Sequence, residues 1–203
     1  MLTLHTHPFS RGRVARWMLE ETGAPYEAVV VPFGPGMRSP GYLALNPMAK
    51  VPTLVHPGGV VTEVAAIVAW LAETFPAAGL LPADKGSFLR WMFLGAGPLE
   101  YAITNASMGF HVPAESEGRM GYGSLDRVLG ALAAQLDRTP NLCGDAWSAA
   151  DLYLGSQVAF AAERGGLPVP PRLMAWATEG RDRPAAKRAQ EKDDALAASL
   201  PRG

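Results

Sequence analysis

The stretch NPMAKVPTLV, residues 46–55, decides how the first part of this chain folds. Pro52 has no N–H and a fixed φ, so it does not fit inside a central strand. It fits the first residue of a strand, or a tight turn made by a cis X–Pro bond, which costs only about 0.5–1 kcal/mol relative to trans. A turn of that kind leaves the N–H and C=O of Val51 unpaired, and an extended peptide ligand can pair with them like an added strand.

A hairpin and a helix are predicted directly after this turn. Residues 57–59 are Pro-Gly-Gly, and they separate two β-branched runs that read as antiparallel strands. Glu63 follows the second run and precedes an apolar, alanine-rich helix over residues 65–74. A carboxylate before a helix can bind an ammonium group, and the free N–H groups of the helix start can bind a carboxylate. The segment therefore suits the head group of an amino acid.

The order of predicted elements over residues 1–76 is β-α-β-α-β-β-α, which is that of a thioredoxin-like fold with a mixed four-stranded sheet. Residues 77–86 are rich in Pro, Gly and Ala and are expected to form a linker. Residues 87–203 carry helical periodicity and form the predicted all-helical domain, so the fold class is α/β plus all-α. Its predicted helices cover residues 87–108, 125–136, 152–162 and 172–179, and a charged tail, 181–194, is expected to cover the surface loosely.

Composition narrows the classes of partner. Hydrophobic residues make up 48% of the 203 residues, charged residues 18%, and the formal net charge is −1, which argues against a nucleic-acid partner. The apolar stretches are interrupted by Gly, Pro or charge, so no membrane span is expected, and residues 1–5 lack the layout of a signal peptide. Cys143 is the single cysteine, which fits a reducing cytoplasm, and no metal-binding spacing is present.

The run N-P-x-x-K-V-P-x-L, followed by T-E-V-x-x-I-x-x-W-L, resembles the glutathione-binding half of the glutathione S-transferase family, in particular its bacterial members. The resemblance extends over nearly all of the chain. It implies that glutathione is the co-substrate and that a second, helical domain contributes the site for an electrophile. The family usually has Ser after the Glu, and here a valine follows it, whose backbone N–H can still serve. The glutathione-binding residues implied in this way are Lys50, Val51, Pro52, Glu63 and Val64.

Ser10 is the catalytic candidate. Lowering the pKa of a thiol from about 8.5 by two units requires roughly 2.7 kcal/mol of preference for the anion. A hydroxyl donor at a helix N-terminus can supply this preference. Serine-type members of the family place their activating hydroxyl at a similar point, between the first strand and the first helix. The alternative is that the Ser10 hydroxyl caps the helix. Arg11 and Arg13 can also stabilise a thiolate, but we expect them to face solvent or a partner.

Candidates for the electrophile pocket are Tyr101, Met108 and Phe110, each of which can equally belong to the core. Trp91 and Phe93 are predicted to be packing residues, because aromatic residues at helical spacing are usually interior. Lys50 either binds the glycine carboxylate of glutathione or is a solvated lysine.

The expected function is transfer of glutathione, as thiolate, to a small apolar electrophile, a detoxification reaction. The resemblance further implies a homodimer. Two alternatives stay open: another glutathione-dependent enzyme, such as an isomerase or a peroxidase, and a non-catalytic glutathione-binding or regulatory protein of the same fold.

Overall fold

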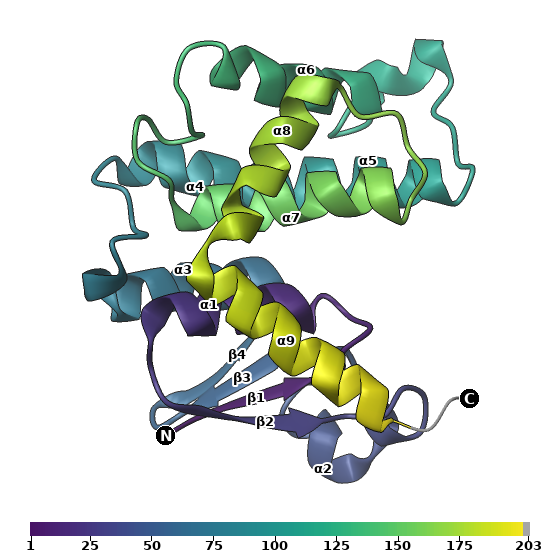
Figure 1. Ribbon diagram of the computed structural model, residues 1–203. Coiled ribbons are helices and arrows are strands. Elements are labelled where there is room, and N and C mark those ends of the chain that lie inside the picture. The colour runs from purple at the N-terminus through teal and green to yellow at the C-terminus, as the bar shows by residue number, and fades with distance from the viewer. Residues whose placement is uncertain (201–203) are drawn as a thin grey trace. The chain divides into compact units, whose positions relative to one another are not determined.

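A computed structural model describes residues 1–200, and contacts divide them into two units, which Figure 1 shows together. The first unit consists of residues 1–78 and 183–200, and the second of residues 79–182. The contacts thus group residues 183–200 with the first unit, whereas the predicted helical domain, 87–203, included them; residues 201–203 lie outside the described part of the chain. Helix α9 (Pro184–Ser199) packs along α1 (Gly12–Thr22) and belongs to the first unit.

The first unit contains a mixed four-stranded sheet in the order β2-β1-β3-β4, as predicted. The central strand β1 pairs in parallel with β2 and antiparallel with β3, which forms a hairpin with β4. Helices α1 and α3 contact each other, and α9 lies beside α1 (Figure 1). The elements of this unit are β1 (Leu2–Thr6), α1, β2 (Tyr26–Val30), α2 (Pro40–Leu43), β3 (Thr53–His56), β4 (Gly59–Thr62), α3 (Val64–Thr74) and α9.

The core of the first unit follows from the period of each element. Strand β1 buries alternate residues, with Leu2, Leu4 and Thr6 facing inward. Helix α1 buries its apolar stripe, in which Met18 and Leu19 are fully covered. The sheet and these helices therefore share one apolar layer, which fixes the strand ends that carry the candidate site.

The charged C-terminal segment is an anchored helix, so the expectation of a loose tail is wrong. Asp193 of α9 pairs with Arg16 of α1 at 2.8 Å, and their side chains are only 1% and 5% exposed. Glu20 of α1 accepts hydrogen bonds from Arg188 and Lys192 of α9. The charged residues of the tail are evident from the sequence, but their ion-pair partners are not. These partners lie about 170 residues earlier in the chain.

The second unit is helical, with α7 in contact with α4, α5 and α8. The predicted single helix over 87–108 is interrupted by a π-helical segment, Gly95–Leu99, which contains Pro98. Proline lacks the N–H that an α-helix requires at this point, so the helix changes its hydrogen-bond pattern there. The helices are α4 (Lys85–Leu94), α5 (Glu100–Ser107), α6 (Leu125–Leu136), α7 (Ala149–Glu163) and α8 (Pro171–Glu179).

Burial in α4 separates the two aromatic residues that were expected to pack. Trp91 is fully buried, as predicted, whereas Phe93 is 71% exposed, so its assignment to the core is wrong. Positions 91 and 93 are two residues apart, about 200° around a helix, and therefore lie on opposite faces. No helix within residues 1–200 has the length and apolar character needed to cross a membrane.

Candidate functional site

The sheet register brings three chain segments to one end of the first unit. His5 of β1 pairs with Thr53 of β3, and Thr53 also pairs with Thr62 of β4. The loop after β1, the residues before β3 and the residues after β4 therefore leave the sheet at the same edge. These segments carry Ser10, the Val51–Pro52 pair and Glu63, all within the first unit.

The Val51–Pro52 peptide bond is cis, and Pro52 directly precedes β3. Of the two placements considered from the sequence, the cis turn is the one observed, and β3 begins one residue later, at Thr53. Among residues 1–200, none hydrogen-bonds to the main-chain N–H or C=O of Val51. These two groups remain available to an extended ligand, because the ladder with β1 begins only at Thr53.

Two buried side chains hold the turn that precedes Pro52. The hydroxyl of Tyr42 donates to the carbonyl of Lys50, and Asn46 Nδ2 donates to the same carbonyl at 2.9 Å. Both side chains also contact Thr53 Oγ1, at 2.9 and 3.2 Å. Burial raises the pKa of Tyr42, so its hydroxyl stays protonated and continues to donate. The turn is therefore clamped on both sides of the Val51–Pro52 bond.

Glu63 has a backbone conformation that is unfavourable for a residue with a side chain. Its φ is 66° and its ψ is 124°, directly before the first residue of α3. Such a conformation costs on the order of 1–3 kcal/mol and persists only where the surroundings impose it. The side chain is exposed and does not cap α3, and no partner for its carboxylate occurs within residues 1–200. Glu63 and the free N–H groups at the start of α3 thus offer a negative and a positive group side by side.

Ser10 lies in a tight turn between β1 and α1. Its hydroxyl donates to the carbonyl of His7 at 2.7 Å and accepts from the N–H of Gly12 at 3.0 Å. The second contact satisfies the N–H of the first residue of α1, which is close to the alternative capping role, although the N-cap position itself is Arg11 and makes no side-chain cap. The first turn of α1 contains no acidic residue, so its partial positive charge is not neutralised there. A thiolate near Ser10 would meet the hydroxyl and this helix N-terminus.

The beginning of α1 approaches the end of β1 very closely. A Cβ atom on Gly12 would come within 1.9 Å of Thr6 Oγ1, and Thr6 is fully buried. His7 is also buried, and its ring stacks on that of Phe33 with centroids 3.8 Å apart. Burial lowers the pKa of His7. The Ser10 turn is thus supported by an apolar, tightly packed base.

Arg13 is partly exposed, with 37% of its side chain open to solvent, and it also has partners within the first unit. Its Nε donates to the carbonyl of Pro8 at 2.6 Å, and its Nη2 pairs with Asp194 of α9 at 2.7 Å. Arg11 and Lys50 are both exposed. Lys50 has no ion-pair partner within the described residues.

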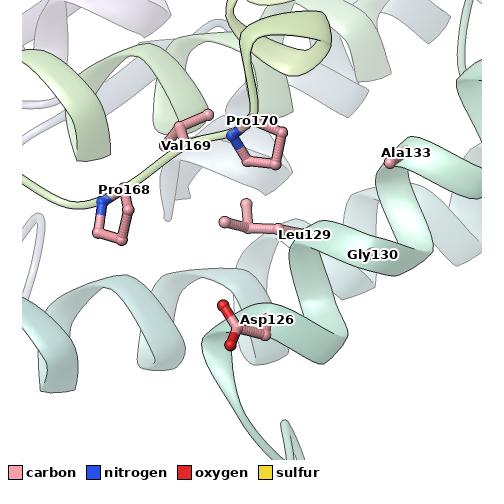
Figure 2. Close-up of a pocket in the computed structure, with 7 residues that line it drawn as sticks. All are labelled: Asp126, Leu129, Gly130, Ala133, Pro168, Val169 and Pro170. Carbon is pink, nitrogen blue, oxygen red and sulfur yellow. The ribbon is translucent and has the colours of Figure 1, made fainter.

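The electrophile candidates lie in the second unit and are all exposed. Tyr101 is 60%, Met108 66% and Phe110 64% exposed, so none of them belongs to the core. A hollow of about 470 Å³ in the same unit is formed by α6 and the segment before α8, and Figure 2 shows the residues around it. None of the three candidates lines this hollow. Its lining residues are Asp126, Leu129, Gly130, Ala133, Pro168, Val169 and Pro170.

A second hollow of about 460 Å³ in the first unit contains none of the predicted site residues. Tyr26 lies in its wall, and burial, followed by the hydrogen bond to Glu20, raises the pKa of Tyr26 to about 12. In the part of the chain that the structure describes, no group of three or more His, Cys, Asp or Glu side chains is arranged to hold a metal ion.

Comparison with known proteins assigns the chain to a family. Residues 4–79 match the family model for the glutathione S-transferase N-terminal domain, and residues 100–179 match that for its C-terminal domain. The chain belongs to the glutathione S-transferase family. The four-stranded mixed sheet followed by a helical region is the fold expected for it.

Individual relatives match this chain over most of its length. It is 32% identical over 170 residues to glutathione S-transferase F10 of Arabidopsis thaliana, covering 75% of this chain and 77% of that one. It is 29% identical over 180 residues to glutathione S-transferase GST-4.5 of Xanthomonas campestris, covering 81% and 84%. A solved structure of a sphingomonad glutathione S-transferase complexed with glutathione is similar with a TM-score of 0.73 and 27% identity, over 95% of this chain and 98% of that one.

Three contacts around the candidate site were missed from the sequence. Asn46 stands in the quoted stretch directly before Pro47, and an asparagine at a turn, whose side chain often bonds to nearby backbone, is the signal that could have revealed its clamp. Tyr42 reads as an ordinary helical-turn aromatic, because its hydroxyl partner is eight residues away. The contact of Arg13 with Asp194 spans 181 residues, and no local pattern indicates it.

Proposed function

We propose that this glutathione S-transferase binds glutathione at the shared sheet edge and transfers it, as thiolate, to a small apolar electrophile. The observation that carries the proposal is the unpaired main chain of Val51 beside Pro52, clamped by Tyr42 and Asn46. A main-chain clasp requires backbone groups that are free and held still, and both conditions are met here. The sphingomonad relative, which carries bound glutathione, supports this class of ligand.

The two ends of glutathione find complementary groups around this clasp. The γ-glutamyl end carries an ammonium and a carboxylate, which suit the free carboxylate of Glu63 and the N–H groups of Val64 and the first turn of α3. The glycine end carries a carboxylate, for which Lys50 supplies an exposed cation. Pro52 shapes the turn between these two contacts.

Ser10 is proposed to donate its hydroxyl hydrogen bond to the sulfur and so to favour the thiolate. In the ligand-free geometry this hydrogen points to the carbonyl of His7, and a rotation about χ1 or the C–O bond must redirect it. The contact from Gly12 N–H can persist, since it uses a lone pair of the oxygen. Capping and activation are therefore compatible roles of one hydroxyl.

The electrophile is proposed to meet apolar side chains that are exposed in the second unit. The side chains suited to this role are Tyr101, Met108 and Phe110. They are already exposed to solvent, so an electrophile can contact them without any rearrangement of the core. We also propose a cytoplasmic homodimer. Its support is the exposure of Leu89 and Phe93 on α4, at 50% and 71%, because large apolar side chains in one place favour an interface.

Turnover of a generic aryl halide with glutathione, compared between wild type and Ser10→Ala, tests the reaction. We expect kcat to fall roughly 10²-fold in Ser10→Ala, because the hydrogen bond to the developing thiolate is lost. The KM for glutathione should stay nearly constant. Ser10→Thr retains the hydroxyl and serves as the matched control. Equal rates in wild type and Ser10→Ala would move the activating role to another group.

Retention on immobilised glutathione separates the alternatives. Binding without turnover of any aryl halide would indicate a non-catalytic glutathione-binding protein. Activity only with a peroxide or an isomerisable substrate would indicate the other enzyme classes. Absence of binding would overturn the proposal altogether.

A further inference from the structure

The loop that carries Ser10 is held mainly by short-range contacts. The N–H and the hydroxyl of Ser10 both donate to the carbonyl of His7, at 3.0 and 2.7 Å. The N–H of Phe9 donates to His7 Nδ1 at 3.3 Å. Each of these contacts joins residues two or three positions apart. They shape the turn, whereas its position relative to the rest of the unit depends on longer-range contacts. One of these is the stacking of the His7 ring on Phe33, with centroids 3.8 Å apart.

Arg13 connects this loop to the other end of the chain. Its Nε donates to the carbonyl of Pro8, two residues before Ser10, at 2.6 Å. Its Nη2 donates to Asp194 Oδ1 on α9 at 2.7 Å. The guanidinium is planar, and its Nε and Nη2 donors have a fixed separation. One rigid group therefore spans the distance between the loop and the helix.

Helix α9 is itself held firmly at this point. Asp193, the neighbour of Asp194, forms the buried ion pair with Arg16. Lys192 and Arg188 bind Glu20 on the same face of α1. Asp194 thus stands on a helix whose position is fixed by partners on α1, and it can serve as an anchor.

The exposure of the Arg13 pair argues against a role in overall stability. The side chains of Arg13 and Asp194 are 37% and 54% exposed, and exposed ion pairs contribute little to the free energy of unfolding. What the geometry supplies is the position of the Pro8 carbonyl. That carbonyl belongs to the turn whose next residues present the Ser10 hydroxyl at the start of α1.

We propose that Arg13 is a positioning residue that couples α9 to the Ser10 loop, so that the C-terminal helix helps to place the thiol-activating hydroxyl. The effect on chemistry rests on the proposed function of Ser10. The mechanical coupling between α9 and the loop does not, and the two can be tested separately.

The mechanical part is tested without ligand by amide hydrogen exchange over residues 9–12, since Pro8 has no amide hydrogen. Arg13→Gln should accelerate exchange there roughly tenfold, because a hydrogen bond to a charged donor is lost. Asp194→Asn should give a smaller acceleration, since the contact with Pro8 persists. Arg183→Gln is the matched control: Arg183 pairs with Glu21 of α1 at 2.7 Å, an equally exposed arginine near the other end of the same helix pair. Exchange in Arg13→Gln that equals that of the control would overturn the coupling.

The chemical part is tested by the pH profile of kcat/KM with glutathione and an aryl halide. In Arg13→Gln the midpoint of the thiol ionisation should move to higher pH and kcat should fall, with KM for glutathione unchanged within about twofold. Arg13→Lys should recover part of the loss, because a single ammonium can reach one of the two acceptors. A profile that keeps the wild-type midpoint would contradict the role in catalysis. A wild-type protein without turnover would contradict the proposed function. The hydrogen-exchange experiment would still show whether Arg13 couples α9 to the Ser10 loop.

Discussion

Helix α7 of the second unit and helix α3 of the first begin in opposite ways. In the first turn of α7, Asp151 is 3% exposed and accepts hydrogen bonds from the N–H and hydroxyl of Ser148, the N–H of Leu142 and the indole of Trp176. Before α3, Glu63 is exposed, adopts a positive φ and caps nothing. One carboxylate is saturated with protein donors, and the other is held without any found among residues 1–200.

The difference is the one expected between a carboxylate that serves folding and one that is proposed to bind a ligand. A buried carboxylate is stable only when donors from the protein replace its water. An exposed carboxylate keeps its water and can exchange it for an ammonium group. The strain at Glu63 has no compensating cap within the described residues, which is the pattern expected at a binding site. Mutations at these two positions should therefore have opposite consequences for stability and binding.

The largest effect is expected for Asp151→Ala. Removing the carboxylate leaves several buried donors without an acceptor, so the free energy of unfolding should fall by about 3–5 kcal/mol. Urea denaturation measures the change. Asp126→Ala is the control, because Asp126 is an exposed carboxylate in the first turn of α6 and should contribute only about 0.3–1 kcal/mol. Similar losses in both variants would remove the contrast between the two helix starts.

A smaller effect, on binding, is expected at Glu63. Both Glu63→Ala and Glu63→Gly should weaken glutathione binding about tenfold, or 1.4 kcal/mol, as measured by calorimetry. Only glycine relieves the positive φ, so Glu63→Gly should be more stable than Glu63→Ala by about 1 kcal/mol. Unchanged affinity in both variants would show that the carboxylate is not a ligand, whatever the strain.

The smallest effect concerns the histidines before α1. Burial lowers the pKa of His5 and His7 in the folded state, so the unfolded state, with a histidine pKa of about 6.5, binds more protons. The stability that neutral imidazoles contribute is fully present above about pH 6.5 and falls as the pH drops through and below that value. The melting temperature of His7→Phe should depend less on pH over this range than that of the wild type. An identical dependence would mean that His7 is not the group involved.

Local chemistry explains how much of the fold and the candidate site could be predicted. Pro52 and the Pro-Gly-Gly turn at 57–59 restrict the backbone wherever they occur, so the turn, the hairpin and α3 followed from adjacent residues. One failure has a local origin. Pro98 interrupts the predicted helix by removing one N–H, and the hydrogen-bond pattern that replaces it depends on the surrounding packing.

The sequence by itself determined the thioredoxin-like order of elements, the turn at Val51–Pro52 and the placement of Ser10 between β1 and α1, because these depend on residues close together in the chain. Only the tertiary structure decided that α9 packs on α1, that Arg13 joins Asp194 to the carbonyl of Pro8, and that Glu63 is held at positive φ. Such contacts arise from where distant segments meet, and periodicity in a single sequence does not specify which charges will meet.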